Sequence, residues 1–178
     1  MTNAVLISIH PQWCDKIANG IKIIEVRKTR PKIETPFKCY IYMTSGGREW
    51  RDPWCTAVMP PNGKIYNGAR KVIGEFICDR VYYFGNLSND EWSRLVDESH
   101  SCRKQLITQQ ALLTEKEIHE YANGKNLYGW HISELKIYDV PKELSEFETR
   151  KDYGAWVTWG KVERAPQSWC YVYEEKRK

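Results

Sequence analysis

The chain has 178 residues, a length typical of one domain with a single hydrophobic core. Its formal net charge of +4 and its pI of about 8.7 are mildly basic, which permits RNA binding but falls short of a dedicated duplex-DNA binder. No apolar run approaches the roughly 20 residues that cross a bilayer, and the beginning of the chain lacks the pattern of a secretion signal. We therefore expect a single domain over residues 1–178, a cytoplasmic location and no membrane partner.

The six cysteines are scattered, without a CxxC motif and without paired histidines. Neither a zinc site nor a disulfide framework is indicated, so we expect reduced thiols, no metal and no cofactor. The 8 Trp and 11 Tyr are abundant, and they suit both half-buried strands and surfaces on which bases stack.

The first quarter of the chain predicts three strands and a helix. Residues 5–9 form a β-branched run, and Pro11 then suits the first turn of a helix that ends near Gly20. Residues 21–27 are rich in β-branched side chains and predict a second strand. Residues 37–44 predict a third.

Glycine and proline then mark a long excursion over residues 45–69. It carries rings interleaved with cations, at Arg48, Trp50, Arg51 and Trp54. Such a segment suits a ligand-facing arm for single-stranded RNA, but it equally suits a loop that packs on its own rings.

The centre of the chain predicts one long strand followed by two helices. Residues 71–84 are the longest strand-like run, and Gly74 within it indicates a bulge or a close backbone approach. Residues 88–91 and 114–117 both fit the capping box that begins a helix.

The remainder predicts two strands on either side of a second excursion. Strand character returns over residues 127–138, a charged stretch occupies residues 142–164, and alternating aromatic residues over 167–173 close the sheet. Strands outnumber helices and do not alternate regularly with them. We therefore expect an α+β barrel with about five to seven strands and three or so flanking helices.

A charged motif follows the first helix directly. Gly20 is followed by Lys22, Glu25 and Arg27 within an otherwise β-branched segment. In an ideal strand Glu25 and Arg27 share a face and Lys22 points to the other, although a corner between helix and strand brings all three together. The alternative is an exposed Glu25–Arg27 pair worth at most about 1 kcal/mol.

The run LISIHPQWCDKIANGIKIIEVRK resembles the opening of the ASCH domain, in which a strand and a helix lead into a Gly-x-Lys-x-x-Glu-x-Arg motif. The segments YIYMTS, VIGEF, LYGWHISELKIYDVPKEL and PQSWCYV extend the resemblance over most of the chain. It implies a PUA-like β-barrel with a cleft beside the motif and an RNA or nucleotide-like ligand. Residues Lys22 and Arg27 would engage phosphate or a base edge, with Glu25 fixing them.

Some ASCH proteins are enzymes, either ribonucleases or amidohydrolases of modified nucleosides. The amidohydrolases have a Thr where this chain has Glu25, so their Thr-dependent mechanism does not carry over. An enzyme would use Lys22 and Glu25 as acid–base groups, with His131 as a further candidate for such a role. A third alternative is a protein-interaction domain that binds through its Trp-bearing loops.

Further ligand-binding candidates lie along the predicted strands, at Tyr42, Thr44, Glu75, Trp130 and His131. Each also has an ordinary structural interpretation: the first two suit the barrel rim, Glu75 an exposed strand position, and a lone His a packing role.

Overall fold

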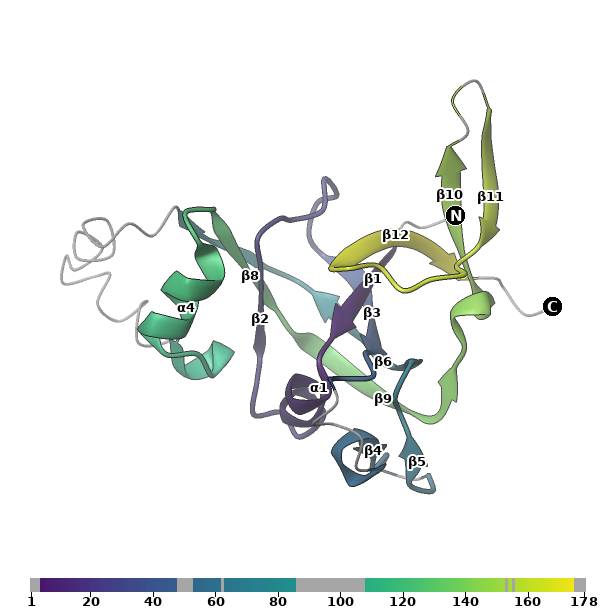
Figure 1. Cartoon of the computed structure of the whole chain (residues 1–178), viewed down its shortest axis with the longest axis horizontal. Helices are drawn as coiled ribbons and strands as arrows, with labels where there is room; N and C mark the ends of the chain where they lie inside the picture. Colours follow the sequence, from purple (N-terminus) through teal and green to yellow (C-terminus); the bar gives the residue numbers. More distant parts are fainter. Residues whose placement is uncertain are drawn as a thin grey trace.

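The computed structural model describes residues 4–47, 53–61, 63–85, 108–152, 154 and 156–174. The fold is mixed α+β, with a large sheet that runs through its centre (Figure 1). The order in this seven-stranded sheet is β11-β10-β12-β1-β3-β6-β9, and only the β1–β3 pairing is parallel. Its strands are β1 (Ala4–Ile9), β3 (Phe37–Met43), β6 (Lys71–Cys78), β9 (Ser133–Lys142), β10 (Phe147–Asp152), β11 (Val157–Lys161) and β12 (Trp169–Glu174).

Two smaller sheets and short helices complete the described structure. A three-stranded antiparallel sheet has the order β2-β8-β7, with β2 (Ile24–Arg27), β7 (Val81–Gly85) and β8 (Leu127–His131). The pair β4 (Ala57–Val58) and β5 (Tyr66–Asn67) forms a third sheet. The helices are α1 (Pro11–Ala18) and α4 (Glu115–Ala122), with 3-10 turns at η2 (Pro53–Thr56) and η3 (Leu144–Glu146), and residues 108–111 are helical as well.

Two runs predicted as single strands are each divided between the two larger sheets. Residues 71–84 become β6 and β7, and residues 127–138 become β8 and β9. The breaks lie side by side, because the His131 amide donates to the Arg80 carbonyl at 2.9 Å. The prediction of about five to seven strands therefore fits the large sheet but misses the second one. Within the described residues, the strand pairings do not close a ring.

The strand predicted over residues 21–27 begins only at Ile24. The amides of Ile21 and Lys22 both donate to the Lys16 carbonyl, so this stretch closes helix α1 instead of pairing in a sheet. The close backbone approach predicted at Gly74 is confirmed. Gly74 lies so close to β9 that an added Cβ would be 2.5 Å from the Lys136 carbonyl oxygen.

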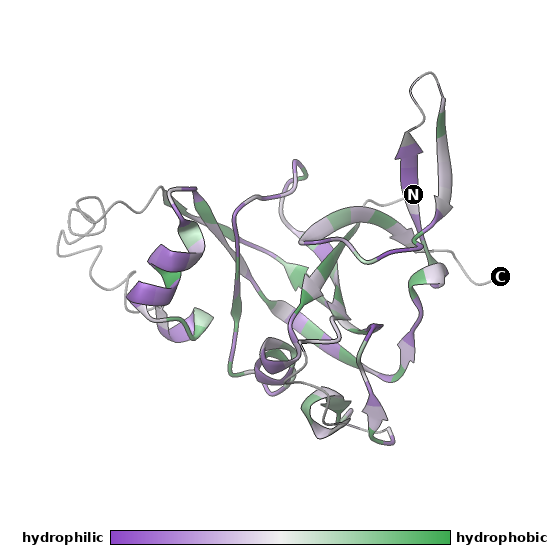
Figure 2. Cartoon of the chain, in the orientation of Figure 1, coloured by the Kyte–Doolittle hydropathy of each residue, from purple (hydrophilic) through white to green (hydrophobic). Residues whose placement is uncertain are grey.

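Apolar side chains pack into three clusters. The main core lies between the two larger sheets and α1, and it includes Ile7, Ile17, Phe76 and Trp130. A second cluster covers the other face of the large sheet. A third lies where α4 packs on the three-stranded sheet. Figure 2 shows the hydrophobic positions concentrated along the strands, with polar residues predominating on α4.

Both predicted excursions contain ordered structure. Strands β10 and β11 form a hairpin that projects away from the body of the domain (Figure 1). The first excursion holds η2, β4 and β5, and Trp54 there is 77% exposed. Arg48, Trp50 and Arg51, and the helix predicted after residues 88–91, lie outside the described residues. The predicted helix at 114–117 is confirmed as α4 with its capping box. None of the described helices is long and apolar enough to cross a bilayer.

Candidate ligand-binding site

The charged residues of the motif form one cluster at the corner between α1 and β2. The Lys22 ammonium lies 3.6 Å from Oε2 of Glu25, and Nη2 of Arg27 lies 3.1 Å from Oε1. Glu25 and Arg27 share a face of β2, as alternation requires. Lys22 reaches the same face because it precedes the strand and sits on the turn that closes α1. The three residues, called the motif cluster below, are therefore brought together by the corner.

The motif cluster is buried. The side chains of Lys22, Glu25 and Arg27 are 2%, 5% and 12% exposed, which excludes the alternative of an exposed strand pair. The Lys22 ammonium donates to the Ala111 carbonyl at 2.6 Å, and Nη2 of Arg27 donates to the Ser8 carbonyl at 2.6 Å. Burial lowers the pKa of Lys22, and the neighbouring Glu25 carboxylate opposes that shift. The cluster thus ties β2 to β1 and to the segment before α4.

Aromatic rings surround the motif cluster. The Lys22 ammonium lies 4.8 Å from the centre of the Trp13 ring. Trp130 is the register partner of Glu25 across β2 and β8, and its ring lies 5.7 Å from Phe37 and 5.9 Å from Trp169. The electron-rich face of the Trp13 ring helps to accommodate the Lys22 charge beside the apolar core.

Three polar atoms in this region are buried without a hydrogen-bond partner. They are Glu25 Oε2, Arg27 Nε and Trp130 Nε1. The strand register places all three residues on the same face of the three-stranded sheet. Buried polar atoms nearly always have a hydrogen-bond partner in folded proteins. These two donors and one acceptor therefore indicate a place for water or for a polar group of a ligand.

A large basic cleft lies directly beside the motif cluster. It has a volume of about 1240 Å³, and one wall is the segment of residues 28–35, called the strap below. The opposite wall includes Tyr128, which is the register partner of Arg27, and Val81, which is the register partner of Trp130. The cleft therefore opens on the same sheet face that carries the motif cluster.

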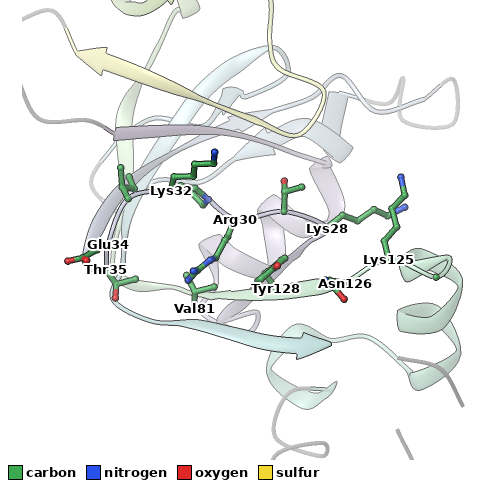
Figure 3. A pocket seen from close by; sticks show the side chains of 13 residues that line it. Lys28, Arg30, Lys32, Glu34, Thr35, Val81, Lys125, Asn126 and Tyr128 are labelled. Carbon is green, nitrogen blue, oxygen red and sulfur yellow. The ribbon is translucent and has the colours of Figure 1, made fainter. Parts of the chain in front are cut away.

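Positive charge dominates the lining of this cleft. Lys28, Arg30 and Lys32 come from the strap and Lys125 from the turn after α4, whereas Glu34 is the single acidic residue among the described residues that line it. Figure 3 shows Lys28 and Lys125 approaching each other at one end, while Arg30 extends across the cleft and Glu34 lies at the other end. The excess of cations over carboxylates favours an anionic ligand.

The strap is held against β12 by two hydrogen bonds. Trp169 Nε1 donates to the Thr29 hydroxyl at 2.9 Å, and the Lys32 amide donates to the Tyr171 hydroxyl at 2.7 Å. One contact holds the strap by its backbone at Lys32 and the other by the side chain of Thr29, so the strap is tied to β12 at two points. The aromatic residues predicted over 167–173 thus serve the cleft as anchors.

The predicted site residues do not all converge. Trp130 lies beside Glu25 as described, but the neighbouring His131 points to the opposite face of β8. Its Nδ1 lies 2.6 Å from Oδ1 of Asp79, and this contact lowers the pKa of Asp79 against the opposing effect of burial. His131 is therefore separated from the motif cluster, and an acid–base role shared with it gains no support from the geometry.

Glu75 and Tyr42 lie on the far face of the large sheet. The Tyr138 hydroxyl donates to Glu75 Oε2 at 2.5 Å, and the Lys38 ammonium lies 3.2 Å from Oε1. Tyr42 is buried in the second cluster together with Tyr138. Both are thus separated from the cleft by the sheet.

Thr44 follows the end of β3, and its amide donates to the Ile9 carbonyl at 2.9 Å. Its hydroxyl accepts from the amide of Gly46 at 3.5 Å, which is a local turn contact. Ligand contact by Thr44 stays a prediction, as does the acid–base role of Lys22 and Glu25.

The basic residues that line the cleft were not predicted from the sequence. A signal for them was present, because Lys28, Arg30 and Lys32 alternate directly after the motif. Lys125 and Tyr128 join them only through the pairing of β2 with β8, which links segments about a hundred residues apart. No pattern within either segment announces that contact.

Comparison with solved structures agrees with this architecture. The crystal structure of ASCH from Zymomonas mobilis superposes with a TM-score of 0.57, at 19% sequence identity over 96% of this chain and 87% of that chain. The chain has the fold of an ASCH domain.

Two mutants of the same Zymomonas mobilis protein, a tyrosine-to-phenylalanine and a serine-to-alanine substitution, match the ASCH fold of this chain equally well. Each has a TM-score of 0.56 and 18% identity, over 96% of this chain and 90% or 88% of the other. No protein-family model and no curated protein matches the sequence. The predicted resemblance to ASCH domains is thus confirmed in the fold.

Proposed function

We propose that this ASCH-fold domain binds RNA or a modified nucleotide in the basic cleft beside the motif cluster. The observation that carries the proposal is the lining of the cleft, in which the described residues include four cations, Lys28, Arg30, Lys32 and Lys125, and one carboxylate, Glu34. Lysine and arginine side chains are the usual partners of phosphate, and arginine binds it bidentately.

The size and shape of the cleft also suit a nucleotide ligand. Its volume of about 1240 Å³ exceeds the usual range of about 300–1,000 Å³ for small-molecule pockets. Tyr128 adds an aromatic ring to the basic wall.

The structure changes the roles proposed for the motif residues. Lys22 and Arg27 are already bonded to backbone carbonyls inside the domain, so the strap cations are better placed to hold phosphate. We propose that the motif cluster forms the floor that positions β2 and the strap. We also propose that the two larger sheets are the halves of a PUA-like barrel, since one apolar core fills the space between them.

Binding is best tested by fluorescence anisotropy with a labelled ten-nucleotide uridine-rich RNA, between 50 and 200 mM salt. Lys28→Glu/Lys125→Glu should weaken binding and reduce the slope of log K against log salt by about 1.4, because each phosphate contact on a single strand contributes about 0.7. Lys64→Glu is the matched control for Lys28→Glu alone, since the two make the same change in charge and Lys64 is exposed on the β4–β5 connection, away from the residues that line the cleft. Equal losses in Lys28→Glu and Lys64→Glu would refute the proposed site.

A further inference from the structure

Two tyrosines form a pair at the edge of the basic cleft. Tyr83 on β7 and Tyr128 on β8 are register partners, and Tyr128 is in turn the partner of Arg27 on β2. The two rings are 5.5 Å apart between centroids, with an interplanar angle of 47°. They form a row across the three-stranded sheet, on the face to which the cleft opens.

The Tyr83 side chain is exposed and takes no part in the apolar cluster beneath α4. Its neighbours Tyr82 and Phe84 point to the opposite face of β7, where they pack in the cluster beneath α4. Tyr83 itself is 63% exposed, among the largest exposures of the described apolar side chains. An exposed ring in contact with a second ring at a basic cleft is typical of a surface on which bases stack.

Basic side chains flank the tyrosine pair. Lys28 and Lys125 line the same cleft as Tyr128 and approach each other in Figure 3. The Lys28 ammonium also lies 4.9 Å from the centre of the Tyr121 ring, which holds this cation toward the α4 side of the cleft. Rings on the sheet face and cations along the strap are the combination that binds unpaired nucleotides.

We propose that the ligand is a single-stranded polynucleotide whose bases stack on Tyr83 and Tyr128 while its phosphates follow Lys28, Arg30 and Lys125. The inference rests on the proposed function and narrows it to one class of nucleic acid. Bases within a duplex are already stacked and paired, so only unpaired bases can meet the two rings. Stacking on an aromatic side chain depends little on the identity of the base, so weak sequence preference follows.

The test compares one single-stranded ten-nucleotide RNA with a duplex of the same length, using anisotropy at fixed salt. Tyr83→Ala should weaken binding of the single strand by roughly 5- to 150-fold, without changing the salt slope. Tyr83→Trp keeps a ring and should restore binding. Trp156→Ala is the matched control, because Trp156 is 77% exposed and belongs to the connection between β10 and β11.

Three outcomes would overturn the inference. The first is that the wild-type protein binds the duplex as tightly as the single strand. The second is that Tyr83→Ala binds the single strand with full affinity while Lys28→Glu/Lys125→Glu loses affinity. In both cases the proposed function stands. If the wild-type protein binds neither RNA, the proposed function fails as well. Because Tyr83 is exposed, its substitution leaves the core intact, and a circular dichroism spectrum verifies that the variant is folded.

Discussion

Replacing Glu25 by glutamine should destabilise the domain strongly. The carboxylate is the counter-ion of two buried cations, with Lys22 at 3.6 Å and Arg27 at 3.1 Å. Glutamine has nearly the same shape, so packing is preserved while the negative charge is lost. Lys22 can lose its proton in response, but Arg27 cannot, because its guanidinium stays charged in proteins.

The magnitude follows from the burial of the cluster. Breaking a buried ion pair by removing one partner costs about 3–5 kcal/mol, against at most about 1 kcal/mol for an exposed pair. A domain of this size loses roughly 2–4 °C of Tm per kcal/mol, so Glu25→Gln should melt about 6–20 °C lower. The loss should shrink toward pH 10. Burial lowers the pKa of folded Lys22 below 10.5, and removing Glu25 lowers it further, so deprotonation relieves the uncompensated charge.

Urea unfolding followed by circular dichroism measures the effect. The matched control is Glu120→Gln, because Glu120 pairs with Lys116 at 3.8 Å on α4 with side chains 66% and 84% exposed. It should cost no more than about 0.5 kcal/mol. The double variant Lys22→Met/Glu25→Gln should recover part of the loss, because one of the two uncompensated cations is gone. A cost for Glu25→Gln below about 1 kcal/mol would refute the reasoning.

Two further predictions concern other parts of the fold. In the capping box of α4 the Thr114 hydroxyl accepts from the Glu117 amide at 3.2 Å, so Thr114→Ala should cost about 1 kcal/mol in urea unfolding, and an unchanged midpoint would contradict this. Burial raises the pKa of Glu75, but hydrogen bonds from Tyr138 and Lys38 outweigh it and hold the pKa below its ordinary value of 4.5. The stabilisation by the Glu75 carboxylate is therefore present above pH 4.5 and is lost as the pH falls through the lowered pKa. The loss of unfolding free energy in Glu75→Gln should be constant from pH 6 to 8 and should shrink in acid. A loss that persists at pH 3 would contradict the lowered pKa of Glu75.

Local signals in the sequence predicted the individual elements well. Pro11 and Gly20 bound the first helix, and the capping box at Thr114 begins α4 where expected. Division of the strands between sheets could not be predicted. The sequence WHISEL around Ile132 contains neither glycine nor proline to mark a break. The break is set by pairing with residues far away in the chain, since the Ile132 amide donates to the Ile23 carbonyl.

The sequence predicted which residues form the motif cluster better than it predicted how they are arranged. The motif identified Lys22, Glu25 and Arg27, and a corner between helix and strand was one of the two arrangements expected for them. Their burial could not be foreseen, because it depends on Ala111 and on rings from β8. The resemblance to ASCH domains implied that Lys22 and Arg27 engage the ligand at the cleft, whereas the cations that line the cleft in the structure come from the strap.

The most direct test of nucleotide binding in the basic cleft is an NMR titration of the labelled protein with the uridine-rich RNA. Amide shifts should change along the strap, residues 28–35, and over residues 124–128, and hardly at all in the β10–β11 hairpin. Shifts confined to that hairpin, or no shifts at millimolar RNA, would contradict it.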